Sequence, residues 1–165
     1  MLCDVGCGSL RGGRRFIEYL DRGNYLGLEG EEDLVELGLR HELDPTVREE
    51  KAPEFVISYG FEFRRFSKSP SHALAVSVFS HLNESDIRRC LENLADHATG
   101  PCRFYATYFE SERTRPNFRE SHPQLAFYHT REKMHGLGRD AGWTTTFLDD
   151  WASPSGQLMM RFAKE

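Results

Sequence analysis

A short motif near the start of the chain has residue types that could bind both ends of an amino-acid group. The motif is Asp4-Val5-Gly6-Cys7-Gly8, and a segment with helical spacing follows it. Gly6 and Gly8 would let the backbone turn tightly beside a ligand without interference from a Cβ atom. The free N–H groups at the start of the helix would bind a carboxylate, and the Asp4 carboxylate would pair with a cationic amino group. The motif therefore predicts a site for a ligand that carries both an ammonium and a carboxylate.

A second acid, Glu29, indicates that this ligand also contains a ribose. Glu29 ends a short apolar run after the helix, and a carboxylate at the end of a second strand can accept hydrogen bonds from both hydroxyls of a ribose. A dinucleotide site would need a third glycine where Arg11 stands, and Gly12 comes one residue too late. The acids and glycines therefore favour a nucleoside with an amino-acid end over a dinucleotide.

Alternating strands and helices are expected to position these residues. Hydrophobic periodicity predicts strands over 2–5, 25–29, 54–58, 72–79, 102–109, 144–148 and 157–162, and helices over 14–20, 31–43, 84–97 and 131–141. Residues 45–51 and 64–72 are expected to be connections, and Asn83 is expected to cap the third helix. The turn-forming run Ser153-Pro154-Ser155-Gly156 suits an antiparallel final pair of strands. This order predicts an α/β sandwich with a mainly parallel sheet.

The chain resembles the class I S-adenosylmethionine-dependent methyltransferases. The first motif of that family is similar to Asp4-Val5-Gly6-Cys7-Gly8, and its second strand ends in an acid like Glu29. The resemblance extends over nearly the whole chain, through residues 55–61, residues 74–82 and Gly142-Trp143. It implies a Rossmann-like three-layer sandwich with seven strands in the order 3-2-1-4-5-7-6, of which the seventh is antiparallel.

The resemblance also implies S-adenosylmethionine as the cofactor. Gly60 and Phe61 would lie beside its adenine, and Ser77 and Val78 near its methionine part. The full set of implied cofactor residues is Asp4, Gly6, Cys7, Gly8, Glu29, Gly60, Phe61, Ser77 and Val78. Family members often have an acid or amide near Gly60 that binds the adenine amino group, a role that would fall here to Phe61, Glu62 or the backbone. They also usually have a helix before the first strand, so we expect residues 1–165 to form a single domain whose N-terminal helix is missing.

One histidine is a candidate general base. His81 follows the fourth expected strand, beside the implied position of the methyl group, and an ordinary histidine pKa near 6.5 suits a base at neutral pH. A structural or helix-capping histidine is the alternative. Candidate acceptor contacts are Tyr108, at the end of the fifth strand, and His122 and Tyr128, in a long polar segment of the kind that often forms a lid. A core position for Tyr108 and ordinary surface positions for the other two are the alternatives.

Composition limits the partners. The formal net charge of -5 disfavours nucleic acid, whose phosphates attract basic surfaces, so a small molecule is the favoured acceptor. No run approaches the length of a membrane span. Cys3, Cys7, Cys90 and Cys102 have no C-x-x-C spacing, which indicates a reduced compartment and a cytoplasmic protein. His129 and His135 lack further ligands around them, and no metal is predicted; the oligomeric state stays open.

The sequence thus favours methyl transfer from S-adenosylmethionine to an unidentified acceptor. A binding or interaction module that keeps the fold without turnover is one alternative. A nicotinamide-dependent oxidoreductase is another, which Arg11 at the place of the third glycine disfavours.

Overall fold

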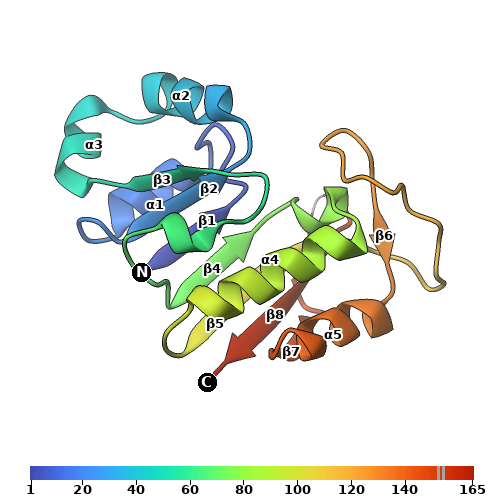
Figure 1. Ribbon diagram of the computed structural model, residues 1–165. Helices are drawn as coiled ribbons and strands as arrows, with labels where there is room; N and C mark the ends of the chain where they lie inside the picture. Colours follow the sequence, from blue (N-terminus) through green and yellow to red (C-terminus); the bar gives the residue numbers. More distant parts are fainter. Residues whose placement is uncertain (152, 154) are drawn as a thin grey trace.

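A single sheet organises the chain, and the computed structural model describes residues 1–151, 153 and 155–165 of it. The strands run in the order β3-β2-β1-β4-β5-β8-β7, with the short strand β6 paired to β5 (Figure 1). Their bounds are β1 Leu2–Val5, β2 Tyr25–Glu29, β3 Glu54–Ile57, β4 His72–Ala75, β5 Cys102–Glu110, β6 Tyr128–His129, β7 Thr144–Leu148 and β8 Leu158–Lys164. The helices are α1 Gly13–Tyr19, α2 Glu32–His41, α3 Pro45–Lys51, α4 Glu84–His97 and α5 Arg131–Asp140, with 3-10 turns η1 Phe63–Arg65 and η2 Phe79–His81.

The predicted strand order is confirmed. β1 to β5 pair in parallel in the order 3-2-1-4-5, and β8 runs antiparallel between β5 and β7. β8 is the seventh of the expected strands, and β6 is a two-residue addition that the sequence did not predict. The result is the predicted Rossmann-like sheet.

Helices cover both faces of this sheet and form two cores. α4 and α5 pack one face through Ile87, Leu91, Met134 and Leu137, which join the larger core with the strands behind them. On the other face, α1 and α2 belong to a smaller core around Ile17, Tyr25 and Val35. Figure 1 shows α1, α2 and α3 grouped at β1, β2 and β3, and α4 and α5 lying across β4, β5 and β8.

Two local predictions are wrong. Residues 45–51 form helix α3 rather than a connection, because Asp44 Oδ1 accepts the Thr46 N–H at 2.8 Å and Pro45 occupies the first turn, where its missing N–H costs nothing. The fourth strand ends at Ala75 instead of continuing to residue 79, because Ser77 turns with φ +58° and cannot continue a strand. This early end lets the chain cross the carboxyl edge of the sheet.

The remaining local predictions hold with small shifts of boundary. Asn83 Oδ1 accepts the Asp86 N–H at 2.9 Å and caps α4 as predicted. The predicted turn Ser153-Pro154-Ser155-Gly156 lies partly outside the described residues. In the described part of the chain, no helix is both long and apolar enough to cross a membrane.

Two glycines of α5 give a matched test of this packing. A Cβ atom on Gly138 would lie 2.5 Å from Thr145 Cγ2 and 2.9 Å from the Phe162 ring, whereas one on Gly136 would meet nothing within 4 Å. We expect Gly136→Ala to raise the free energy of unfolding by about 0.5–1 kcal/mol through helix propensity, and Gly138→Ala to lower it by about 1–3 kcal/mol through overpacking. Urea unfolding measures both, and equal changes would contradict the close approach of α5 to β7 and β8.

Candidate functional site

A cavity of about 640 Å³ lies where β1, β2, β3 and β4 end. In an open parallel sheet, ligands bind outside the carboxyl ends of the strands near the point where strand order reverses, here between β1 and β4. The volume is in the range of small-molecule sites. Of the residues predicted for the ligand or the chemistry, those that line the cavity are Gly6, Glu29, Phe61, Ser77, Val78 and His81.

The glycine turn after β1 packs against the turn after β4. Gly6 has φ +70°, and a Cβ atom there would lie 2.5 Å from Val78 Cγ2. The N–H groups of Gly6 and Cys7 both donate to the Leu28 carbonyl, at 2.7 and 3.1 Å. Only glycine combines this backbone conformation with this approach, so the residue type predicted for a ligand turn also brings β1 and β4 together.

Glu29 ties the glycine turn to the end of β2. Its Oε2 accepts the Gly8 N–H at 2.8 Å, and its Oε1 accepts the N–H groups of Gly30 at 2.7 Å and Glu31 at 3.1 Å. A carboxylate offers about four lone-pair sites, so the side chain is anchored by the backbone with capacity remaining on Oε2. This arrangement could present an acceptor to hydroxyl groups of a ligand.

The surroundings of Asp4 disfavour the charged form of its carboxyl group. Its Oδ2 accepts the Tyr25 hydroxyl hydrogen at 2.7 Å. Burial raises the pKa of Asp4 to about 6; the Tyr25 hydrogen bond acts in the opposite direction, and the Glu29 carboxylate adds to the rise. The charged side chain that acts on Asp4 is therefore another acid, and a cationic group of a ligand would relieve the arrangement.

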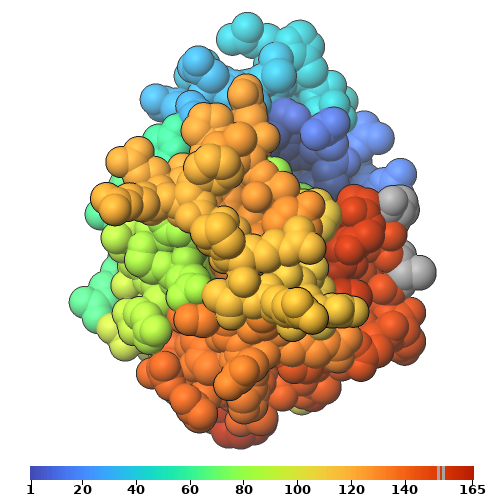
Figure 2. Space-filling view, turned by 90° about the vertical axis from the view of Figure 1, so that its right-hand side faces the viewer, coloured from blue at the N-terminus to red at the C-terminus, as the bar shows by residue number. Residues whose placement is uncertain are grey.

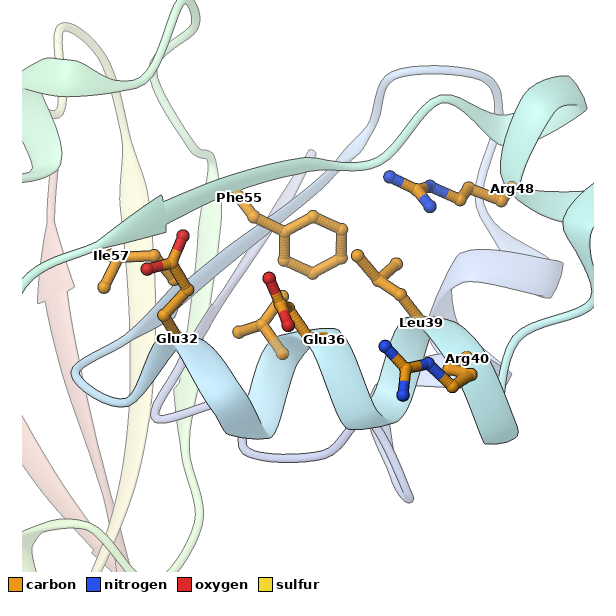
Figure 3. Close-up of a pocket in the computed structure, with 8 residues that line it drawn as sticks. Glu32, Glu36, Leu39, Arg40, Arg48, Phe55 and Ile57 are labelled. Carbon is orange, nitrogen blue, oxygen red and sulfur yellow. The ribbon is translucent and has the colours of Figure 1, made fainter.

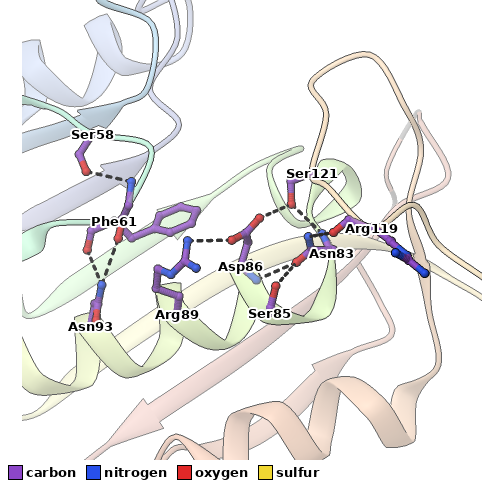
Figure 4. A network of polar contacts seen from close by, with 10 residues as sticks. Ser58, Phe61, Asn83, Ser85, Asp86, Arg89, Asn93, Arg119 and Ser121 are labelled. Atoms are coloured by element: carbon purple, nitrogen blue, oxygen red, sulfur yellow. Dashed lines mark hydrogen bonds and ion pairs between the residues drawn. The ribbon is translucent and has the colours of Figure 1, made fainter.

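The turn after β3 is held in a strained form beside the cavity. Ser58 Oγ accepts the Gly60 N–H at 3.0 Å, and Asn93 Nδ2 on α4 donates to the carbonyls of Gly60 and Phe61 at 3.1 Å each (Figure 4). Phe61 has φ +55°, which is unusual for a residue with a large side chain. Such strain persists only where the surroundings enforce it and is concentrated at functional sites.

A hydrogen bond fixes the tautomer of His81. Its Nδ1 lies 2.9 Å from the Leu125 carbonyl oxygen, which can only accept, so Nδ1 carries the hydrogen. In the neutral ring, Nε2 then carries the lone pair and can take a proton. Because His81 also lines the cavity, the geometry suits a general base.

The segment 119–127 lies across the site and is bonded to it. Figure 2 shows the orange surface that contains this region between the blue surface above it and the light-green surface below it. Ser121 Oγ donates to Asp86 Oδ2 at 2.5 Å and accepts the Asn83 N–H at 2.9 Å, and Asn83 Nδ2 donates to the Arg119 carbonyl at 2.7 Å (Figure 4). The predicted lid is therefore anchored to the start of α4.

The three predicted acceptor contacts have different surroundings. Tyr108 is fully buried in the larger core, and its hydroxyl has no partner among the described residues. His122 is exposed beside the lining residues Ser121 and Pro123. Tyr128 stacks on Phe109 with ring centroids 5.4 Å apart. These three residues are not among the described lining residues of the cavity.

The remaining predicted cofactor residues support the site from behind, and other lining residues were missed. Cys7 and Gly60 directly adjoin lining residues in sequence, and Asp4 and Gly8 lie two positions from Gly6, but none of the four is among the described lining residues. The lining residues that the sequence analysis did not assign to the site are Arg11, Leu28, Gly30, Leu34, Ser58, Tyr59, Leu82, Asp86, Arg89, Ser121 and Pro123. Most of them directly neighbour a predicted site residue in the sequence, and this adjacency is the sequence signal that could have identified them. Asp86 and Arg89 are i, i+3 partners on the polar face of α4, where nothing in the sequence distinguishes them.

A second cavity of about 510 Å³ lies between α2, α3 and β3 (Figure 3). Val35, Leu39, Phe55 and Ile57 form its apolar floor, and two glutamates and two arginines surround it: Glu32, Glu36, Arg40 and Arg48. None of these described residues was predicted for the ligand site.

Solved structures match the chain over its whole length, whereas no family model and no curated protein matches it. An amino pentose methyltransferase from Micromonospora echinaspora, solved with S-adenosylmethionine, aligns with a TM-score of 0.75 and 14% identity over 99% of this chain and 83% of its own. Magnesium protoporphyrin IX methyltransferase from Synechocystis PCC 6803, also solved with S-adenosylmethionine, aligns with a TM-score of 0.69 and 13% identity over 100% of this chain and 70% of its own. A methyltransferase from Methanosarcina mazei aligns with a TM-score of 0.69 and 12% identity over 98% of this chain and 89% of its own.

This is the class I methyltransferase fold. At identities this low the likeness establishes the fold alone. The implied Rossmann-like sandwich is thereby confirmed, and the methyltransferase fold places the first glycine turn and the ends of β2, β3 and β4 around one cavity.

The raised pKa of Asp4 gives the site a measurable effect on stability. Because the folded chain holds the Asp4 proton up to about pH 6 and the unfolded chain releases it near pH 4, the Asp4 contribution to the free energy of unfolding falls as pH rises from 4 to 6. We expect Asp4→Asn, which keeps an acceptor for Tyr25, to be more stable than the unaltered chain at pH 7.5 by about 2–3 kcal/mol, and the difference to vanish near pH 4. Urea unfolding at several pH values measures this.

Asp21→Asn is the control, since Asp21 is exposed and its substitution should change stability by less than about 0.5 kcal/mol. An Asp4→Asn protein that is less stable than the unaltered chain at pH 7.5 would show that the carboxylate is satisfied in the folded state.

Proposed function

We propose that this chain is an enzyme that binds S-adenosylmethionine in the 640 Å³ cavity and transfers its methyl group to a small-molecule acceptor. The observation that carries the proposal is the convergence of Gly6, Glu29, Phe61, Ser77, Val78 and His81 on one cavity of a class I methyltransferase fold. These residues come from the ends of four strands and from η2, and they were named from sequence motifs.

The cavity and the residues beside it have a complementary group for each part of the cofactor. The partly buried Asp4 carboxylate, two residues before the lining residue Gly6, has a raised pKa and suits the ammonium of the methionine part. Glu29 is anchored by three backbone N–H groups and keeps acceptor capacity for the ribose hydroxyls. Phe61 and the exposed ring of Tyr59 line the end of the cavity at β3, where an adenine would find apolar and aromatic surface.

When bound, S-adenosylmethionine supplies an electrophilic methyl group on a sulfonium. The chain's own contribution is to orient an acceptor, exclude water and take a proton where the acceptor must lose one. His81 Nε2 is the base for that proton, because Nδ1 is committed to the Leu125 carbonyl. The segment 119–127 holds the histidine in this state and limits access of water to the cavity.

A small acceptor agrees with the charge of the chain and with its structural neighbours. One neighbour is an amino pentose methyltransferase and another acts on magnesium protoporphyrin IX, as their names state. The formal net charge of -5 offers no general attraction for nucleic acid. The acceptor would lie at the part of the cavity that His81, Ser121 and Pro123 line.

Binding of S-adenosylhomocysteine tests the cofactor assignment. We expect micromolar affinity by calorimetry for the unaltered chain. Glu29→Gln should weaken it by about 10–100-fold, because a charge-assisted acceptor is lost and an amide N–H would face the Gly8 N–H. Glu32→Gln, an exposed change on α2, is the matched control and should leave the affinity unchanged.

A folded sample that binds no S-adenosylhomocysteine would refute the assignment. A rise in melting temperature with NADH but not with S-adenosylhomocysteine would favour the oxidoreductase alternative. Binding without transfer of labelled methyl groups to alcohols, phenols, carboxylic acids or amines would favour the module without turnover.

The base role of His81 predicts a separation between binding and turnover. Once an acceptor is found by that screen, His81→Gln should lower kcat by about 10²–10⁴-fold, the usual contribution of a general base. The affinity for S-adenosylhomocysteine should stay within about threefold, a change of under 1 kcal/mol. A loss of cofactor affinity with unchanged kcat would instead support the structural alternative for this histidine.

A further inference from the structure

Three polar residues from distant parts of the sequence form a closed ring of hydrogen bonds, which includes the backbone N–H of one of them, beside the cavity. The Ser77 N–H donates to Thr107 Oγ1 at 2.7 Å, the Thr107 hydroxyl donates to Gln157 Oε1 at 2.6 Å, and Gln157 Nε2 donates to Ser77 Oγ at 2.8 Å. Thr107 lies within β5, and Gln157 directly precedes β8. Both are buried, whereas Ser77 is exposed and lines the cavity.

Donor and acceptor chemistry gives the ring one direction. Thr107 Oγ1 accepts from the Ser77 backbone, so its own hydrogen is directed to the Gln157 carbonyl oxygen. The amide nitrogen of Gln157 is then the atom that faces Ser77 Oγ.

The ring acts on a residue in an unfavourable backbone conformation. Ser77 has φ +58°, a left-handed conformation that is uncommon for residues other than glycine. Its N–H and its Oγ are the two groups that the ring holds. The next residue, Val78, lies against Gly6 of the glycine turn, where a Cβ atom would come within 2.5 Å of Val78 Cγ2. The strained turn therefore sets where the end of β4 meets the end of β1.

We infer that Thr107 and Gln157 are positioning residues that hold Ser77 in its left-handed conformation and so shape the floor of the cofactor cavity. This inference rests on the proposed function. Neither residue lies among the described lining residues of the cavity, so they act through Ser77 and Val78. Strand β5 and the residue that precedes β8 thereby contribute to a site built mainly by the first four strands.

Thr107→Val removes the hydroxyl while keeping the shape of the side chain, and Thr107→Ser keeps the hydroxyl. We expect Thr107→Val to weaken S-adenosylhomocysteine binding about tenfold, the effect of one lost hydrogen bond, and Thr107→Ser to retain most of the affinity. Ser77→Gly added to Thr107→Val should restore binding, because glycine adopts φ near +58° without support. Thr146→Val, an exposed change on β7, is the control and should bind normally.

The outcomes separate the inference from the proposed function. Wild-type affinity in Thr107→Val would overturn the inference, as would a folded Thr107→Val protein whose weak binding Ser77→Gly does not restore. If Thr107→Val does not fold, the affinities of Ser77→Gly and Ser77→Ala are compared instead. Both variants lack the side-chain bond to Gln157, and only glycine adopts the left-handed conformation without strain. Weaker binding by Ser77→Ala supports the inference, and equal binding overturns it. An unaltered, folded chain that fails to bind S-adenosylhomocysteine would instead refute the proposed function.

Discussion

The approach of Gly6 to Val78 sets the geometry on which the site depends. The two residues follow neighbouring parallel strands, β1 and β4, at the point where the strand order reverses, and a methyl group on Gly6 would collide with the valine. Both turns use left-handed backbone, at Gly6 and at Ser77. Glycine adopts it freely, whereas serine needs outside support. The cavity therefore depends on a close contact on the β1 side and, on the β4 side, on hydrogen bonds from Thr107 in β5 and from Gln157 just before β8.

Two carboxylates also converge near the ends of the adjacent strands β1 and β2. Glu29 finds three backbone donors, but Asp4 has a tyrosine hydroxyl and an unfavourable acidic neighbour, which together with burial leaves its pKa near 6. An arrangement that reduces stability without ligand and suits a cationic group is typical of binding sites, where function and stability compete. The partly buried Asp4 carboxylate and the strained turns at Phe61 and Ser77 likewise lower the stability of the folded chain.

The cofactor half of the fold could be predicted from the sequence because its determinants are local. Gly6, Gly8 and Glu29 stand directly at strand ends, and the strand order followed from the resemblance and is confirmed by the pairing. The end of β4 could not be predicted, because the apolar run 72–79 has the composition of a buried strand and the bonds that end it come from Thr107 and Gln157. Helix α3 was missed although Asp44 and Pro45 are a recognised start signal, since the short charged run after them resembled a surface connection.

The part of the cavity that would hold the acceptor is formed by a loop and a helix start rather than by strand ends. Tyr108 was named for its place at a strand end, yet the period of β5 directs it into the core with Phe104 and Ala106. The residues that line that end of the cavity come from the start of α4 and from segment 119–127, which hydrogen bonds of Asn83, Asp86 and Ser121 hold together. The orientation of His81 depends on the same segment through the Leu125 carbonyl. The ends of β1 and β2 are held by parallel strand pairing, whereas this surface depends on the hydrogen bonds between segment 119–127 and the start of α4. The part of the site that would select an acceptor is thus free to vary without disturbing the part that would hold the cofactor.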